Sequence, residues 1–211
     1  MGAADLTGIS FDDFAYVLAD SGVGMALMLN GLPYIGHSRI AGEIAHVQID
    51  PAGQMCSCGN RGCLQTLTGT SALLSLIAQR LAESPIRSTL RGTAETLTAE
   101  AVIAAAHQGD KLAQQTLCDV GEPLGRALAM IVNLLGPAVL VLGGVLASSP
   151  EFVDAARRAM QTNSLSVGGR RVELQTSRLG RDAGARGAAT RILDAVFSER
   201  GPNLLSFKAF P

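Results

Sequence analysis

The chain has 211 residues, 47% of them hydrophobic, so it can bury a substantial core and is not mainly disordered. Its 17 Lys and Arg and 18 Asp and Glu residues give a net charge of −1, which excludes a chain-wide positive field for nucleic acid. No apolar run reaches the roughly 18 residues of a membrane span, and the N-terminus lacks the order of a secretory signal. We therefore expect a cytoplasmic protein without a membrane partner.

The N-terminal part is predicted to be a β-meander. Four short apolar runs predict strands at 14–19, 25–29, 32–35 and 45–49. Asn30 and Gly31 form a dipeptide that adopts positive φ readily, which indicates a tight hairpin turn between the second and third runs. The stretch 51–62 is rich in Gly, Pro, Asn and Cys and is predicted to be a loop.

Helices are predicted to dominate the rest of the chain. The apolar spacing and the Pro and Gly stops predict helices at 70–84, 99–107, 110–135, 150–160 and 185–197. The uninterrupted apolar run 139–142 predicts a strand buried on both faces, and 171–176 a last strand. This alternation predicts a single α/β domain over residues 1–199, followed by a flexible tail at 200–211.

Four potential metal ligands lie within 18 positions: His46, Cys56, Cys58 and Cys63. One imidazole and three thiolates form the Cys₃His set of a closed tetrahedral zinc site. A reducing cytosol disfavours disulfides, so three cysteines close together in a polar loop indicate Zn²⁺. The alternative is a turn that carries reduced cysteines beside an ordinary histidine. The fourth cysteine, Cys118, falls within a predicted helix and is assigned no role.

The order Gly-Glu-x-x-His at 42–46 and Cys-x-Cys-Gly-x-x-Gly-Cys-Leu at 56–64 resembles the zinc signature of the ROK family of sugar kinases and sugar-responsive repressors. Segments 14–31, 131–145 and 180–189 resemble further stretches of that family. The resemblance implies an actin-like ATPase fold, which is ribonuclease H-like, with sugar in the cleft between two lobes. The chain is similar to the C-terminal lobe with its zinc-bound loop.

Two parts that the resemblance would place upstream are not in the sequence. One is the phosphate loop with the Asn-Asp pair that supplies the catalytic base of the kinases. The other is the helix-turn-helix of the repressors. We therefore expect no catalytic residue in this chain, and contact with DNA only through an N-terminal domain outside it.

The resemblance also implies sugar contacts. Glu43 and His46 match family positions that contact sugar hydroxyls, and Gln65 stands where the family has a glutamate. An amide keeps a hydrogen-bond acceptor but loses charge-assisted strength. Ala45 replaces a family glycine, which would put a methyl group near the pocket. The alternative for Glu43 is a hydrated loop carboxylate.

A degraded nucleotide site is the last implication of the resemblance. Its positions in this chain are Ser21, Gly22, Gly24, Gly143 and Gly144. Asp20 stands where the family has glycine, and its carboxylate would repel phosphate. These glycines would equally suit a simple turn and strand-to-helix packing.

We expect the sugar-effector-binding and oligomerisation portion of a ROK-family transcriptional regulator, self-associated as a dimer or larger homo-oligomer. The intact zinc motif beside degraded phosphate and sugar motifs favours this function over catalysis. One alternative is the C-terminal half of an ATP-dependent, glucokinase-like ROK sugar kinase. Another is a zinc-braced interaction domain that binds no ligand.

Overall fold

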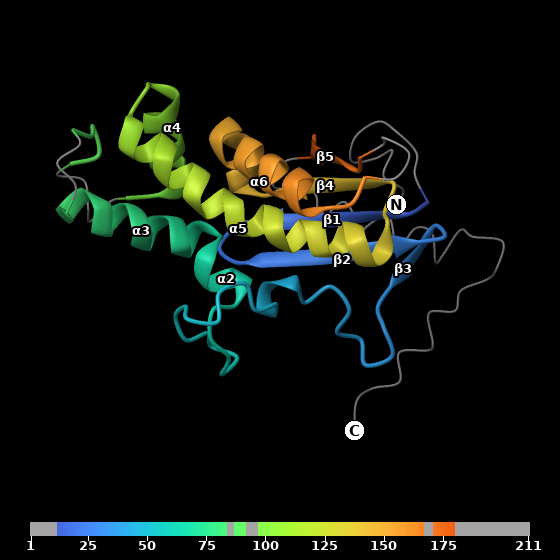
Figure 1. Cartoon of the computed structure of the whole chain (residues 1–211). Helices are drawn as coiled ribbons and strands as arrows, with labels where there is room; N and C mark the ends of the chain where they lie inside the picture. The colour runs from blue at the N-terminus through green and yellow to red at the C-terminus, as the bar shows by residue number, and fades with distance from the viewer. Residues whose placement is uncertain (1–11, 84–86, 92–96, 167–170, 180–211) are drawn as a thin grey trace.

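Five strands form one mixed sheet in the computed structural model of the chain, which describes residues 12–83, 87–91, 97–166 and 171–179. The strand order is β3-β2-β1-β4-β5, and helices α5 and α6 lie against one face of the sheet (Figure 1). The strands are β1 (Phe14–Ala19), β2 (Val23–Leu29), β3 (Leu32–Tyr34), β4 (Val139–Gly143) and β5 (Glu173–Thr176).

The predicted meander is confirmed for its first three strands. β1 pairs antiparallel with β2, and β2 with β3, through a hairpin turn at Asn30 and Gly31, which have φ of 52° and 70°. β1 also pairs parallel with β4, so the hairpin and the βα part share one sheet. β4 is buried along its whole length, as its uninterrupted apolar run predicts.

Five α-helices and two short 3₁₀ helices are found among the described residues. They are η1 (Ile44–His46), α2 (Leu64–Leu67), α3 (Thr70–Glu83), α4 (Ala99–His107), α5 (Lys111–Leu135), η3 (Val145–Ser148) and α6 (Pro150–Asn163). α5 begins after Asp110, whose carboxylate accepts hydrogen bonds from two backbone N–H groups of the first turn. It ends at Gly136, which has a left-handed φ of 55°. The predicted positions of α3 to α6 are confirmed.

The core lies between the sheet and the long helix α5, which packs closely against α6. Gly125 of α5 allows this approach, since a Cβ atom there would lie 2.2 Å from the carbonyl oxygen of Ala156 on α6. Leu117, Leu124 and Leu128 on the same helix are fully buried. The largest apolar cluster includes these residues and residues of β1, β2, β4 and β5. One core therefore packs against both the antiparallel and the parallel strands.

One predicted strand is wrong. Residues 44–46 form η1 in place of a strand at 45–49, and only Gln48 makes an isolated bridge, to Cys63. The turn closes on itself because the N–H of Val47 donates to the carbonyl of Ile44, 3.1 Å away. Helix α2 was not predicted. The predicted helix at 185–197, the preceding segment 182–184 and the tail at 200–211 lie outside the described residues.

In the part of the chain that the structure describes, every helix is too short or too polar to cross a bilayer.

Candidate metal centre

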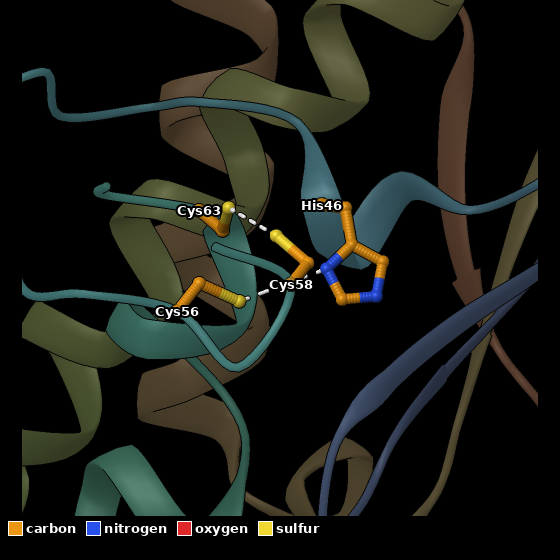
Figure 2. Close-up of side chains that lie close together, drawn as sticks. All are labelled: His46, Cys56, Cys58 and Cys63. Atoms are coloured by element: carbon orange, nitrogen blue, oxygen red, sulfur yellow. Dashed lines mark hydrogen bonds between the residues drawn. The ribbon is translucent and has the colours of Figure 1, made fainter. Parts of the chain in front are cut away.

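The four predicted metal ligands come from three different elements and meet at one point (Figure 2). His46 ends η1, Cys56 and Cys58 lie in the loop 51–62, and Cys63 directly precedes α2. Their ligand atoms, Nδ1 or Nε2 of the imidazole and the three Sγ atoms, all lie within 4.8 Å of one another. The sequence spacing therefore identified a cluster that the fold brings together.

Two distances within this cluster match those between ligands of a single tetrahedral ion. Sγ of Cys56 lies 3.7 Å from Nδ1 of His46, and Sγ of Cys58 lies 3.6 Å from Sγ of Cys63. Ligands at about 2.3 Å for sulfur and 2.0–2.1 Å for nitrogen around tetrahedral zinc are roughly 3.5–3.8 Å apart. The donor set and its spacing thus fit a divalent metal ion.

Backbone hydrogen bonds shape the loop that carries the sulfurs. The N–H of Cys56 donates to the carbonyl of Asn60 at 2.7 Å, and the N–H of Gly59 donates back to Cys56 at 3.0 Å. The carbonyl of Gly62 accepts from the N–H groups of Ile49 and Asp50. These bonds form a tight turn that presents Cys56 and Cys58 on the same side as Cys63.

The thiols differ in their proton affinity. The backbone N–H of Cys58 lowers the pKa of the Cys56 thiol to about 6, against the opposing effect of burial, and the imidazole of His46 lowers it further. Burial raises the pKa of the Cys63 thiol to about 12, and the neighbouring sulfurs of Cys58 and Cys56 raise it further. A cation at the centre of the cluster would stabilise the thiolate forms of all three.

The predicted sugar residues border this cluster. Glu43 is exposed immediately before η1, and Nε2 of His46 points away from the sulfurs in Figure 2. Among the described residues, the His46 ring has no hydrogen bond besides its contact with Cys56. Gln65 on α2 turns its amide toward the β1–β2 turn, since a Cβ on Gly22 would lie 3.9 Å from its Oε1.

Ala45 does not place its methyl group in a pocket. It is 4% exposed and belongs to the main apolar core. The substitution of glycine by alanine at this position therefore adds to the packing under η1 and leaves the exposed side of Glu43 unaffected.

The predicted nucleotide glycines gather where β1 and β4 end. Gly22 lies in the turn after β1, whereas Gly24 lies within β2 and pairs with Leu18. A Cβ on Gly144 would lie 2.2 Å from the carbonyl oxygen of Ala19, so the two strand ends are in close contact. A Cβ on Gly143 would lie 2.0 Å from the hydroxyl oxygen of Tyr16. Both Gly143 and Gly144 thus have a packing role.

A hollow of ≈ 220 Å³ adjoins these strand ends, and Asp20 and Glu100 contribute to its lining. The other lining residues are uncharged: Thr70, Leu74, Leu97, Thr98, Ala99 and Val145. Among the described residues, no Lys or Arg lines this hollow.

Hydrogen bonds between α3 and the turn after β1 were not predicted from the sequence. The N–H of Thr70 donates to the carbonyl of Asp20 at 2.7 Å, and the hydroxyl of Ser71 donates to the carbonyl of Ser21 at 3.2 Å. The buried hydroxyl of Thr68 donates to Val120 on α5 at 2.6 Å. The positions of Thr68, Thr70 and Ser71 in the sequence gave no signal of these distant partners.

Comparison with known proteins identifies relatives of two kinds. The DNA-binding transcriptional repressor Mlc of Escherichia coli is 31% identical over 188 residues, which are 88% of this chain and 45% of Mlc. A glucokinase of Thermotoga maritima is 28% identical over 194 residues, which are 90% of this chain and 61% of the glucokinase. The chain thus spans about half the length of the curated relatives it matches.

Solved structures agree with the fold. A ROK family transcriptional regulator, a homologue of the E. coli Mlc protein, superposes with a TM-score of 0.77 at 32% identity, over 85% of this chain and 45% of that one. A ROK family glucokinase from Streptomyces griseus, in complex with glucose and AMPPNP, has a TM-score of 0.80 at 24% identity, over 87% of this chain and 61% of that one. The expected actin-like α/β fold is confirmed. The ROK family profile matches residues 7–195, and with these relatives it shows that the chain belongs to the ROK family.

Proposed function

We propose that this chain is the sugar-effector-binding and oligomerisation portion of a cytoplasmic ROK-family transcriptional regulator. Zn²⁺ would be held by the four-residue cluster described above, and a sugar or sugar derivative would bind beside it. The regulator would contact DNA through an N-terminal domain outside this chain. Sugar binding would change how the copies in a homo-oligomer are arranged, and thereby the spacing of their DNA-binding domains.

The observation that carries this proposal is the hollow at the ends of β1 and β4, which Asp20 helps to line. In a ROK kinase this end of the sheet would face nucleotide, yet here the carboxylate of Asp20 contributes to the lining of the hollow, and no Lys or Arg of the described residues lines it. A carboxylate about 4 Å from a phosphate charge costs about 4 kcal/mol at an effective dielectric near 20. A regulator needs no phosphoryl transfer and tolerates this arrangement.

A bound metal would support the proposal by bracing the side of the protein that carries Glu43, His46 and Gln65. The loop 51–62 offers few apolar groups to the core: Cys56 is buried, but Met55 is 56% exposed. A metal would replace the missing packing, since its binding free energy stabilises the folded loop. Coordination through Nδ1 would also hold the His46 ring in one orientation.

The sugar would then contact groups on both sides of His46. With Nδ1 on the metal, Nε2 carries the ring proton and can donate to a sugar hydroxyl. The exposed carboxylate of Glu43 can accept from hydroxyls, and the Gln65 amide can do both. Position 65 needs no charge for this contact. Glutamine in place of the family's glutamate would therefore weaken sugar binding without removing the contact.

The second candidate function is that of a ROK sugar kinase. It is favoured by the similarity to the glucokinases of T. maritima and S. griseus. The two candidates differ in whether ATP binds and whether a sugar is phosphorylated.

Calorimetric titration tests these alternatives. We expect heat with one of glucose, N-acetylglucosamine or xylose, and none with ATP. Glu43→Gln should weaken the sugar 5- to 10-fold, roughly the effect of about 1 kcal/mol of hydrogen bonding. The control Glu83→Gln, on the exposed side of α3, should leave affinity unchanged.

Each alternative has its own contrary result. If the full-length protein phosphorylates a sugar with ATP, the kinase assignment is right and the regulator assignment is wrong. Zinc binding without heat from any sugar would favour an interaction domain that takes no ligand.

A further inference from the structure

The three sulfurs of the metal cluster differ in their access to solvent. Cys63 is fully buried and Cys56 is 6% exposed, whereas Cys58 is an exposed residue at the tip of the loop. A small reagent dissolved in water therefore meets the sulfur of Cys58 before the other two.

The sulfurs also differ in their neighbours. Sγ of Cys58 lies 3.6 Å from Sγ of Cys63, in van der Waals contact, whereas Sγ of Cys56, which is within 4.8 Å of both, also contacts Nδ1 of His46 at 3.7 Å. A disulfide needs its sulfurs about 2.05 Å apart, so Cys58 must move toward Cys63 by about 1.6 Å. Gly59 lies between the two cysteines at positive φ, and a Cβ atom there would meet nothing within 4 Å, so the backbone at Gly59 is free to make this movement.

We propose that this cluster is a redox switch: a peroxide oxidises Cys58, a disulfide forms with Cys63, and the metal is released. The inference rests on the zinc site of the proposed function and goes beyond it by assigning the chain a response to oxidants. Cys58 is the residue attacked and Cys63 is the residue that closes the bond.

The chemistry balances with hydrogen peroxide as the oxidant. The Cys58 sulfur attacks one peroxide oxygen, the O–O bond breaks, and the departing hydroxide takes a proton to become water. The Cys63 sulfur then attacks the sulfenic acid of Cys58, an S–S bond forms, the S–O bond breaks, and the departing hydroxide takes a proton from solvent to give a second water. The two thiolates lose two electrons in total, and the peroxide gains them. The ion keeps two of its four protein ligands.

Release of the ion would be felt beyond the loop. Cys63 directly precedes α2, and its neighbour Leu64 donates its N–H to the carbonyl of Val47 beside His46. α2 carries Gln65, which lies by the turn after β1. Oxidation would therefore disturb the side of the protein at which the sugar is proposed to bind.

The test is peroxide titration of the zinc-loaded protein, with released zinc followed by a chromogenic chelator and disulfides mapped by peptide mass spectrometry. We expect stoichiometric zinc release, a disulfide that joins Cys58 to Cys63, and rebinding after reduction in the presence of zinc. Cys118→Ser serves as the control, because Cys118 lies on α5 outside the cluster, and this variant should release zinc as the unaltered protein does.

Cys58→Ser should slow zinc release at least 10-fold if it still binds the ion. Should this variant fail to bind zinc, the peptide map of the unaltered protein decides the question. Retention of zinc by the oxidised protein, or a disulfide other than Cys58–Cys63, would overturn the switch alone. Purified protein without zinc would overturn the metal site as well, so the two failures are distinguishable.

Discussion

A Cβ atom on Gly62 would lie 1.5 Å from the carbonyl oxygen of Asp50, and the φ of Gly62 is +62°. The two backbone segments on either side of the metal loop therefore touch at a point that only glycine can occupy. This contact fixes the position of the next residue, Cys63, so that its sulfur lies near the imidazole of His46 on the other segment.

Replacement of Gly62 by alanine should therefore break the metal site without removing a ligand. We expect Gly62→Ala to lower the free energy of unfolding by about 2–3 kcal/mol and to weaken zinc binding, because the backbones must separate. Calorimetric melting and metal titration measure the two effects. Gly24→Ala is the matched control, since its Cβ would meet nothing within 4 Å at an ordinary φ. Equal zinc affinity in both variants would refute the role of the Asp50 contact.

Asp110 should make stability depend on acid pH. Burial by itself raises the pKa of this carboxyl, but hydrogen bonds from the N–H of Ala113, from Ser88 and from Thr89 outweigh it and lower the pKa in the folded protein. A lowered folded pKa adds stability above the unfolded value of about 3.9, and this stability is lost as the pH falls through the folded pKa.

Asp110→Asn should accordingly destabilise the protein by about 1–2 kcal/mol at pH 7, and by less once the pH falls below the lowered pKa of the folded protein, where the native carboxyl is itself protonated. Denaturant unfolding at several pH values measures this. The control Asp154→Asn removes an exposed partner of Arg157 and should change stability by less than about 0.5 kcal/mol. A loss for Asp110→Asn that is the same at every pH would contradict the explanation.

The contact between α5 and α6 should not tolerate a side chain at Gly125. Its Cβ would lie 2.2 Å from the Ala156 carbonyl oxygen and 2.6 Å from the Ala159 Cβ. Gly125→Ala should cost about 1–3 kcal/mol, although alanine favours the helix itself. Gln115→Ala, on the exposed side of α5, is the control and should be neutral or stabilising. A stabilising Gly125→Ala would show that the helices separate at little cost.

Much of the fold could be predicted from the sequence because local signals agree with the tertiary structure. Apolar runs gave β1, β2 and β4, and Asp110 and Gly136 marked both ends of α5. The strand predicted at 45–49 was wrong, since alternating apolar residues cannot tell a half-buried strand from a turn that packs Ile44 and Ala45. Helix α2 has only four residues, too few for a periodic pattern.

The candidate site was predictable to a different degree for each part. The spacing of the soft ligands and glycines in 46–63 predicted that His46 and the three cysteines come together, which the fold confirms. Hydrogen bonds between residues far apart in the chain could not be predicted from the sequence. One example is the carboxylate of Asp110, which accepts from the N–H of Thr89 at 2.7 Å, 21 positions away. That Asp20 and Glu100 line the same hollow could be seen only in three dimensions.

X-ray absorption at the zinc edge is the most direct test of the metal cluster. The protein, purified without added chelator, should contain stoichiometric zinc with three sulfurs at about 2.3 Å and one imidazole nitrogen at about 2.0 Å. Protein without zinc, or zinc surrounded only by oxygen and nitrogen, would contradict the account.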